Sequence, residues 1–182
     1  IFDEIQENLE NSFSKKSFIS ETVLAFKRPF VIKNTSEHLK NIIAIFSKEN
    51  IFVEGIVNTI SSTLKRYEIL SNESIKFDFI MYKKDESFGN FVNAFCDALN
   101  AGTEIMIFEN FNLANESCKG FIRSLCKFGR VEVNTPRGLL EIKVDGEYFV
   151  FINSNSESEF SEDLGNDIYQ SIKDVIKIDE FT

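Results

Sequence analysis

The stretch from Glu104 to Phe111 constrains the fold more than any other part of this chain. Four apolar residues, Ile105 to Phe108, follow the pair Ala101-Gly102 and run directly into polar residues. A short, uninterrupted apolar run is typical of a β-strand buried on both faces, in the middle of a sheet that helices cover. Sheets of this kind bind ligands at the carboxyl ends of their strands, where this strand carries Glu109 and Asn110. The alternative is that Glu109 merely begins a solvated loop.

The length and composition of the chain predict one globular domain. Its 182 residues are enough to bury a sizeable core, and 43% of them are hydrophobic. Phenylalanine occurs 20 times, which we attribute to core filling. The net charge of −9 argues against a general nucleic-acid or anionic-membrane surface, because both partners attract basic proteins. The sequence therefore predicts neither a nucleic acid nor a membrane as partner.

The three cysteines and the single histidine do not have the spacing of a metal site. Cys96, Cys118 and Cys126 fall on the apolar stripes of predicted helices, so we expect them to be reduced, buried and structural. His38 lies among polar residues and is expected at the surface. The sequence shows no signal peptide and no apolar run that could span a bilayer, which favours a cytoplasmic protein. Because the chain begins at Ile1 and not at methionine, we expect it to be a segment of something longer.

Helical spacing of apolar residues predicts two helices near the start of the chain. The first covers residues 1–13, and the second places Phe18 and Phe26 on one face and is expected to end at Pro29. Residues 30–32 are apolar and are interpreted as an edge strand. We therefore describe residues 1–40 as an N-terminal helical segment that covers the core of the domain formed by residues 41–182.

The rest of the chain alternates short strands with helices. Strands are predicted at residues 41–46, 75–82, 105–108 and 148–152, and a hairpin at 131–143 around a Pro/Gly turn. Helices are predicted at 56–67, at 88–99 with Gly102 as its cap, and at 115–129 between Asn115 and Gly129. A polar loop is expected at 156–166, followed by a helix through Ile168, Ile172, Val175 and Ile176. This order indicates an α/β domain with a mainly parallel sheet and right-handed crossovers.

The order of these features resembles the large α/β subdomain of AAA+ ATPases of the Clp unfoldase type. The residues that carry the resemblance are Ile42 to Phe46 for the strand before the Walker A loop, Ile105 to Asn110 for the Walker B strand, Gly129 to Ile142 for the hairpin that follows, Phe151 to Asn155 for the sensor 1 strand, and Lys177 to Glu180 for the arginine-finger segment. The resemblance implies a P-loop NTPase-like three-layer sandwich with an inserted β-hairpin. It also implies that the strand at 105–108 lies between those at 75–82 and 148–152.

The resemblance assigns six residues to a nucleotide site: Val53, Glu54, Glu109, Asn110, Asn155 and Lys177. Residues 47–54 contain no glycine, and Val53 and Glu54 stand where the family has the phosphate-binding Lys and the hydroxyl that holds Mg²⁺. A carboxylate close to a phosphate would repel it by about 1–4 kcal/mol. Asn110 replaces the Glu that activates water, and an amide cannot accept that proton. Lys177 lacks the fork of the arginine finger. These substitutions argue against ATP and Mg²⁺ as cofactors and assign no catalytic residue.

Three hypotheses follow. The first is a catalytically inactive Clp-like AAA+ domain with a structural, regulatory or interaction role, which docks on itself, on an AAA+ ring or on a client protein. The second is a working ATP-dependent unfoldase with a divergent nucleotide site. The third is an unrelated α/β module in which Glu109, Asn110 and Asn155 line a pocket for a polar ligand. A divalent cation held by Glu54, Glu109 and Asp78 is a further possibility, whereas Phe88, near the position of the family's pore loop, is assigned to core packing.

Overall fold

Five parallel strands form one sheet that divides the molecule into two layers of helices. The computed structural model describes residues 1–12, 16–31 and 41–178. The order of the strands across the sheet is β2, β3, β6, β1, β7, and every neighbouring pair is parallel. The strands are β1 (Ile42–Phe46), β2 (Ile75–Asp78), β3 (Ile105–Glu109), β6 (Tyr148–Asn153) and β7 (Asp174–Lys177). The strand at 105–109 lies between β2 and β6, which confirms the expected order and the expected burial of β3 on both faces.

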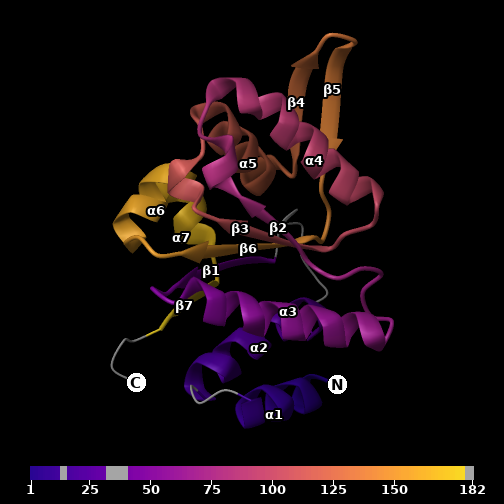
Figure 1. Ribbon diagram of the computed structural model, residues 1–182, viewed down its shortest axis with the longest axis vertical. Coiled ribbons are helices and arrows are strands. Elements are labelled where there is room, and N and C mark those ends of the chain that lie inside the picture. Colours follow the sequence, from indigo (N-terminus) through magenta and orange to yellow (C-terminus); the bar gives the residue numbers. More distant parts are fainter. Residues whose placement is uncertain (13–15, 32–40, 179–182) are drawn as a thin grey trace.

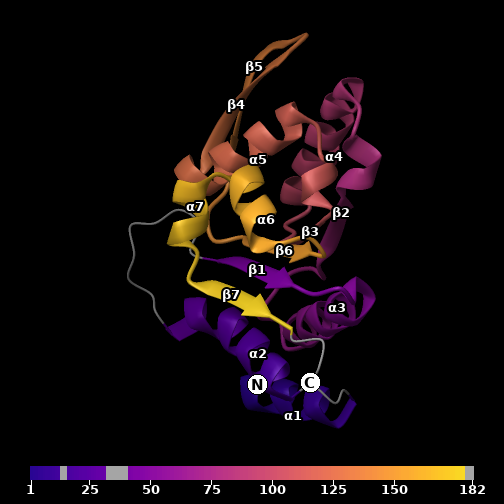
Figure 2. The ribbon, with the colours of Figure 1, turned by 90° about the vertical axis from the view of Figure 1, so that its left-hand side faces the viewer.

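Helices cover both faces of the sheet, as the three-layer architecture requires (Figures 1 and 2). One face carries α1, α2 and α3, and the other carries α4, α5, α6 and α7. The helices are α1 (Phe2–Ser12), α2 (Lys16–Val31), α3 (Asn50–Arg66), α4 (Phe88–Asn100), α5 (Glu116–Phe128), α6 (Glu157–Leu164) and α7 (Asn166–Ser171).

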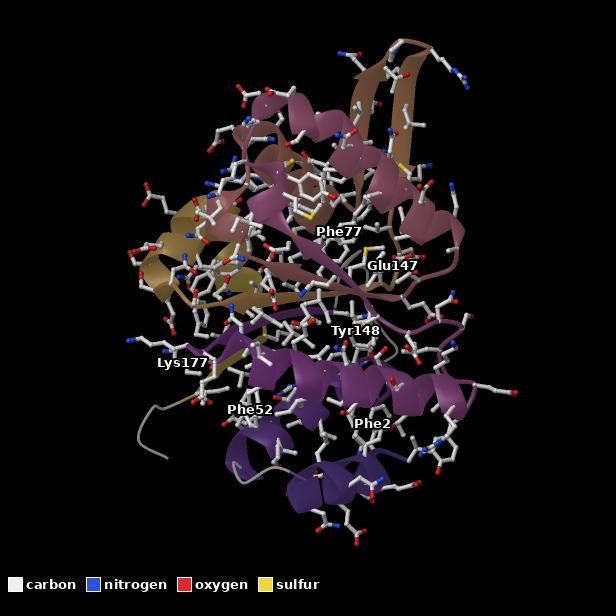
Figure 3. The ribbon with its side chains drawn as sticks, in the orientation of Figure 1. Phe2, Phe52, Phe77, Glu147, Tyr148 and Lys177 are labelled. Carbon is white, nitrogen blue, oxygen red and sulfur yellow. The ribbon has the colours of Figure 1, made fainter. Side chains whose placement is uncertain are left out.

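The two faces of the sheet bury different kinds of side chain, because alternate residues of a strand point to opposite sides. Ile105 and Ile107 of β3 face α3, in a mostly aliphatic cluster to which α1 and α2 contribute. Met106 and Phe108 face the opposite layer, which is rich in phenylalanine. There the Phe108 and Phe149 ring centroids lie 5.1 Å apart at an interplanar angle of 89°. The abundance of phenylalanine is thus explained by core filling, with Phe77 at one side of this cluster (Figure 3).

The boundaries of α4 and α5 follow the capping signals in the sequence. Gly102 adopts a φ of +83° directly after α4, a conformation that glycine adopts without a Cβ clash. The side chain of Asn115 accepts a hydrogen bond from the Cys118 backbone N–H at 2.8 Å, which caps the start of α5. Gly129, with a φ of +70°, ends α5. The predicted hairpin is confirmed as β4 (Arg130–Thr135) and β5 (Gly138–Lys143), which form a separate two-stranded sheet.

The predictions for the second helix and the second strand are partly wrong. Helix α2 continues through Pro29 to Val31, so residues 30 and 31 are helical and do not form an edge strand. A proline in the last turn removes only one backbone hydrogen bond, which explains why the helix tolerates it. Strand β2 ends at Asp78, because the Asp78 carboxylate accepts a hydrogen bond from the Ile80 N–H at 3.1 Å and begins the 3-10 helix η1 (Phe79–Tyr82). A second short 3-10 helix, η2 (Asp85–Ser87), leads into α4.

The predictions for the end of the chain are also partly wrong. The segment expected to be a polar loop forms α6. The Ser156 hydroxyl caps the helix by accepting a hydrogen bond from the Glu159 N–H, while Phe160 and Leu164 are buried one turn apart. The helix expected through Ile176 stops at Ser171. Val175 and Ile176 belong instead to β7, where they pair with Ala44 and Ile45 of β1. Pairing with a distant strand has overridden the helical spacing of these residues.

The cysteines are unpaired, and burial raises the pKa of each thiol. Cys118 is buried as predicted, with a pKa of about 12, whereas Cys96 and Cys126 are only half-buried. His38 lies outside the described residues. Across residues 1–12, 16–31 and 41–178, no helix combines the length and the apolar character that a membrane span needs.

Candidate functional site

The residues assigned to a nucleotide site belong to elements that meet at one edge of the sheet. Because all five strands are parallel, β1, β3, β6 and β7 all end there. Val53 and Glu54 reach this edge from the first turns of α3, and Glu109 and Asn110 from the end of β3. Asn155 follows β6, and Lys177 ends β7.

The connection between β1 and α3 is only three residues long. Strand β1 ends at Phe46 and α3 begins at Asn50, which leaves only residues 47–49 between them. The Phe52 and Val53 N–H groups donate to the Glu49 carbonyl at 3.1 and 3.2 Å, so they already belong to the helix. The Ser47 N–H donates to the Asn153 carbonyl at 2.9 Å and ties the connection to β6. A helical turn thus occupies the residues that form the phosphate-binding loop in the family that the sequence resembles.

Val53 and Phe52 are part of the core and do not face a ligand. Val53 is fully buried in the aliphatic cluster beneath the sheet. Phe52 lies at one end of α3 (Figure 3), and its ring centroid is 6.1 Å from that of Phe18 in α2. Neither position offers the flexible cation that a phosphate site needs.

A lysine that the sequence analysis did not select occupies the centre of the site. The Lys76 ammonium lies 3.3 Å from a carboxylate oxygen of Glu54 and 3.8 Å from one of Glu109. It reaches them from β2, because Lys76 and Asp78 alternate with Phe77 and so project toward α3, as Glu109 does. The alternation of side chains along residues 75–78 could have identified Lys76 from the sequence, since it places Lys76 on the same face of the strand as Asp78.

Burial and neighbouring carboxylates perturb Glu109. Its side chain is only 9% exposed, and its buried Oε1 atom has no hydrogen-bond partner among the residues that the structure describes. Desolvation raises the pKa of Glu109 to about 7, and the carboxyl groups of Glu54 and Asp78 add to the increase while Lys76 opposes it. Burial lowers the pKa of Lys76, but the carboxylates of Glu109 and Glu54 outweigh it and raise that pKa overall. The arrangement is therefore a partly neutralised cluster of two carboxylates around one ammonium group.

Asn110 bonds to Asp78, beside the Glu54–Lys76–Glu109 cluster. It adopts a left-handed conformation with a φ of +56° directly after β3. Its amide donates to Asp78 at 2.9 Å, at the end of the neighbouring strand, just before the 3-10 helix η3 (Phe111–Leu113). Asn110 therefore links the ends of β2 and β3, which is a structural role.

Asn155 and Lys177 do not join the Glu54–Lys76–Glu109 cluster. Asn155 is half-buried in the bend after β6, and among the described residues neither it nor Lys177 bonds to Glu54 or Glu109. Lys177, which is labelled in Figure 3, forms an ion pair with Glu157 at the start of α6 and is 65% exposed. Of the three residues proposed to line a pocket for a polar ligand, Glu109 and Asn110 contact different partners, Lys76 and Asp78, and no hydrogen bond within the described residues joins Asn155 to either of them.

The carboxylates of the site do not form a metal centre. Within the described ranges, no three His, Cys, Asp or Glu side chains are grouped so that they could hold an ion. Asp78 is engaged by Asn110 and Ile80, and the Lys76 ammonium already lies beside Glu54 and Glu109. The positive charge beside Glu54 and Glu109 is thus the Lys76 ammonium group of the chain itself.

Comparison with known proteins shows the fold. No family model matches the sequence, and no curated protein matches it. Among solved structures, the chain is similar to Hsp104 in a closed state with ATPγS and FITC casein, with a TM-score of 0.70 and 8% sequence identity. The match covers 97% of this chain but only 35% of the Hsp104 chain. The similarity shows the fold: the three-layer α/β arrangement around a parallel sheet is similar to that of part of the Hsp104 chain.

Proposed function

We propose that this chain is a Clp-like AAA+ domain that has kept the fold, does not bind or hydrolyse ATP, and works through contacts with other proteins. The observation that carries the proposal is the first turn of α3. It begins at Asn50, engages the Phe52 and Val53 N–H groups, and leaves no loop for a phosphate. Backbone N–H groups that already bond within a helix cannot also bind phosphate oxygens.

The Glu54–Lys76–Glu109 cluster supports the same conclusion. In the family that the sequence resembles, Mg²⁺ neutralises the carboxylate at the position of Glu109. Here the Lys76 ammonium does so from within the chain, at 3.8 Å. A bound nucleotide would bring its negative charge to Glu54, which is 23% exposed at the mouth of this cluster. The Asn110 amide donates to Asp78 and cannot accept the proton of an attacking water.

The partner in this proposal is a protein: a second copy, an AAA+ ring or a client. The fold of Hsp104, a structure that contains FITC casein, supports a role in binding protein chains. The net charge of −9 supports a protein in preference to a nucleic acid. We also propose a cytoplasmic location, which three unpaired cysteines support. In the domain organisation that we propose, residues 1–40 cover the subdomain of residues 41–182, and Leu9 and Phe26 pack in its core.

Calorimetric titration of the full chain with ATP and with ADP, each with Mg²⁺, tests the proposal. We expect no heat of binding at nucleotide concentrations up to about 1 mM, where a site with a micromolar Kd would be saturated. Hsp104 in the same buffer serves as the positive control. Saturable binding, or ATP hydrolysis above the buffer rate, would overturn the proposal in favour of a working ATPase with a divergent site.

A further inference from the structure

The β4–β5 hairpin has a free edge. It projects beyond α4 and α5 at the top of Figures 1 and 2, and among the described residues its strands pair only with each other. Strand β5 is the more exposed of the two, since all of its residues except Ile142 are exposed, whereas alternate residues of β4 are half-buried. The Val144 N–H donates to the Gly129 carbonyl at 2.9 Å, on the β4 side. Because the backbone groups of an antiparallel strand alternate in direction, those of Glu141 and Lys143 point to the free side.

The charged positions of the hairpin ladder are mismatched. Arg130 lies directly opposite Lys143, and Glu132 lies directly opposite Glu141. Like charges at opposed positions of a ladder repel each other. Lys143 and Glu141 contact each other along β5 at 3.3 Å, but their side chains are 73% and 40% exposed, so this contact contributes little. The hairpin thus combines two repulsive cross-strand pairs with opposite charges along each strand.

We propose that the free edge of β5 pairs with the same edge of a second copy of this chain. In an antiparallel arrangement with a two-fold axis at Ile142, Glu141 of each copy lies opposite Lys143 of the other copy. Across the resulting four-stranded sheet, each charged row consists of two cations from one copy and two anions from the other. Both like-charged pairs of the hairpin thereby gain an opposite charge on their free side.

The charges also select the register of this pairing. Moving the two-fold axis by one residue in either direction places Glu141 opposite Glu141 or Lys143 opposite Lys143, which is repulsive. In the favoured register, Leu140, which is 41% exposed, is a diagonal neighbour of Ile142 of the second copy. Backbone hydrogen bonds and this apolar contact supply affinity, while the charges supply specificity.

A second copy fits this edge because its own β5 carries the complementary order of charges. The net charge of −9 on each copy opposes association over long distances, but at about 0.15 M salt this repulsion is screened beyond about 8 Å. Directly opposed side chains of a ladder lie about 5 Å apart, well within that distance. The inference rests on the proposed interaction role and names one partner for it.

Sedimentation velocity of the full chain tests the proposal. The chain is measured at concentrations from about 5 to about 300 µM in about 0.15 M salt. We expect the average mass to rise with concentration from that of one copy toward that of two, because two short strand edges form a small and weak interface.

Charge reversals test the pairing itself. Glu141→Lys gives β5 two cations and Lys143→Glu gives it two anions, so each variant alone should dimerise at least about tenfold more weakly than the parent chain. Mixed in equal amounts, the two variants should dimerise again, because each cation of one then lies opposite an anion of the other. Each reversal also replaces a like-charged pair of the hairpin by an oppositely charged pair, so neither should unfold it.

Three further variants serve as controls. The double reversal, Glu141→Lys with Lys143→Glu, exchanges the two charges and should dimerise within about threefold of the parent chain. Glu86→Lys and Lys83→Glu make the same changes of charge at exposed positions outside the hairpin. Each of these two should change the dimerisation constant less than about twofold.

Three results would overturn the inference: the mass of one copy at every concentration, undiminished dimerisation of both Glu141→Lys and Lys143→Glu, or a mixture of these two variants that is no heavier than either alone. None of these results bears on nucleotide binding, so the inference and the proposed absence of ATP binding fail separately.

Discussion

Replacing Glu109 by glutamine tests whether its carboxylate is held in unfavourable surroundings. The pKa of this buried group is raised from 4.5 to about 7. Each pH unit of that interval corresponds to about 1.4 kcal/mol of differential stability between the two protonation states. The charged form of Glu109 therefore lowers the free energy of unfolding by up to about 3 kcal/mol at alkaline pH. Glutamine keeps the size of the side chain and removes the charge, so Glu109→Gln should be more stable than the parent chain above neutral pH.

The sign of the pH dependence follows from proton binding. Between pH 4.5 and about 7 the folded state binds a proton at Glu109 that the unfolded state does not. The contribution of Glu109 to the free energy of unfolding of the parent chain therefore decreases as the pH rises through that window. Above the window, this contribution no longer changes. The advantage of Glu109→Gln should be small near pH 4.5, grow with pH, and be complete above about pH 7.

Urea unfolding of both chains at several pH values between about 5 and 8 measures the effect. Glu86→Gln removes an exposed carboxylate outside the cluster and is the control for the loss of one charge. A stability difference for Glu109→Gln that is constant with pH, or a loss of stability at about pH 8, would refute the account of Glu109 as a desolvated carboxylate.

Three further predictions concern the scaffold, and urea unfolding at constant pH checks each of them. Phe160→Ala removes a ring that is 1% exposed and should cost about 3–5 kcal/mol. Asn115→Ala removes the cap on the Cys118 N–H and should cost about 1–2 kcal/mol, whereas Asn115→Asp keeps the acceptor and should cost less. Gly55→Ala, with open space around the new methyl group inside α3, should stabilise by about 0.5–1 kcal/mol, whereas Gly146→Ala, at a φ of +86°, should destabilise by at least about 1 kcal/mol.

Local patterns were sufficient to predict the central elements of the fold. The apolar run at 105–108, the stripe of α4 and the caps of α5 each have short-range physical causes, so they can be read from neighbouring residues. The end of the chain was harder. Val175 and Ile176 have helical spacing with Ile172, but their pairing with β1 depends on residues more than a hundred positions away. The capping signal of Ser156 and Glu159 was present in the sequence and would have identified α6.

The candidate site was predictable in part for the same reason. Glu54 and Glu109 were selected through the family resemblance of the segments that carry them, and the structure brings both to one ammonium group. Lys76 was not selected, since its proximity depends on the register of β2 against β3. Asn110 was interpreted as a lost catalytic base, but its actual partner, Asp78, depends on that same register.

The helical first turn of α3 also bears on how such a domain would be controlled. A protein that binds ATP and ADP differently changes its conformational populations with the energy state of the cell, because each ligand stabilises the state that it prefers. Under the proposed absence of nucleotide binding, which the helical turn at this position supports, ATP and ADP would not shift the conformational populations of this domain. Its occupancy by a partner is then set by the concentration of that partner. The binding of such a domain to an assembly would therefore not change with the binding or hydrolysis of nucleotide.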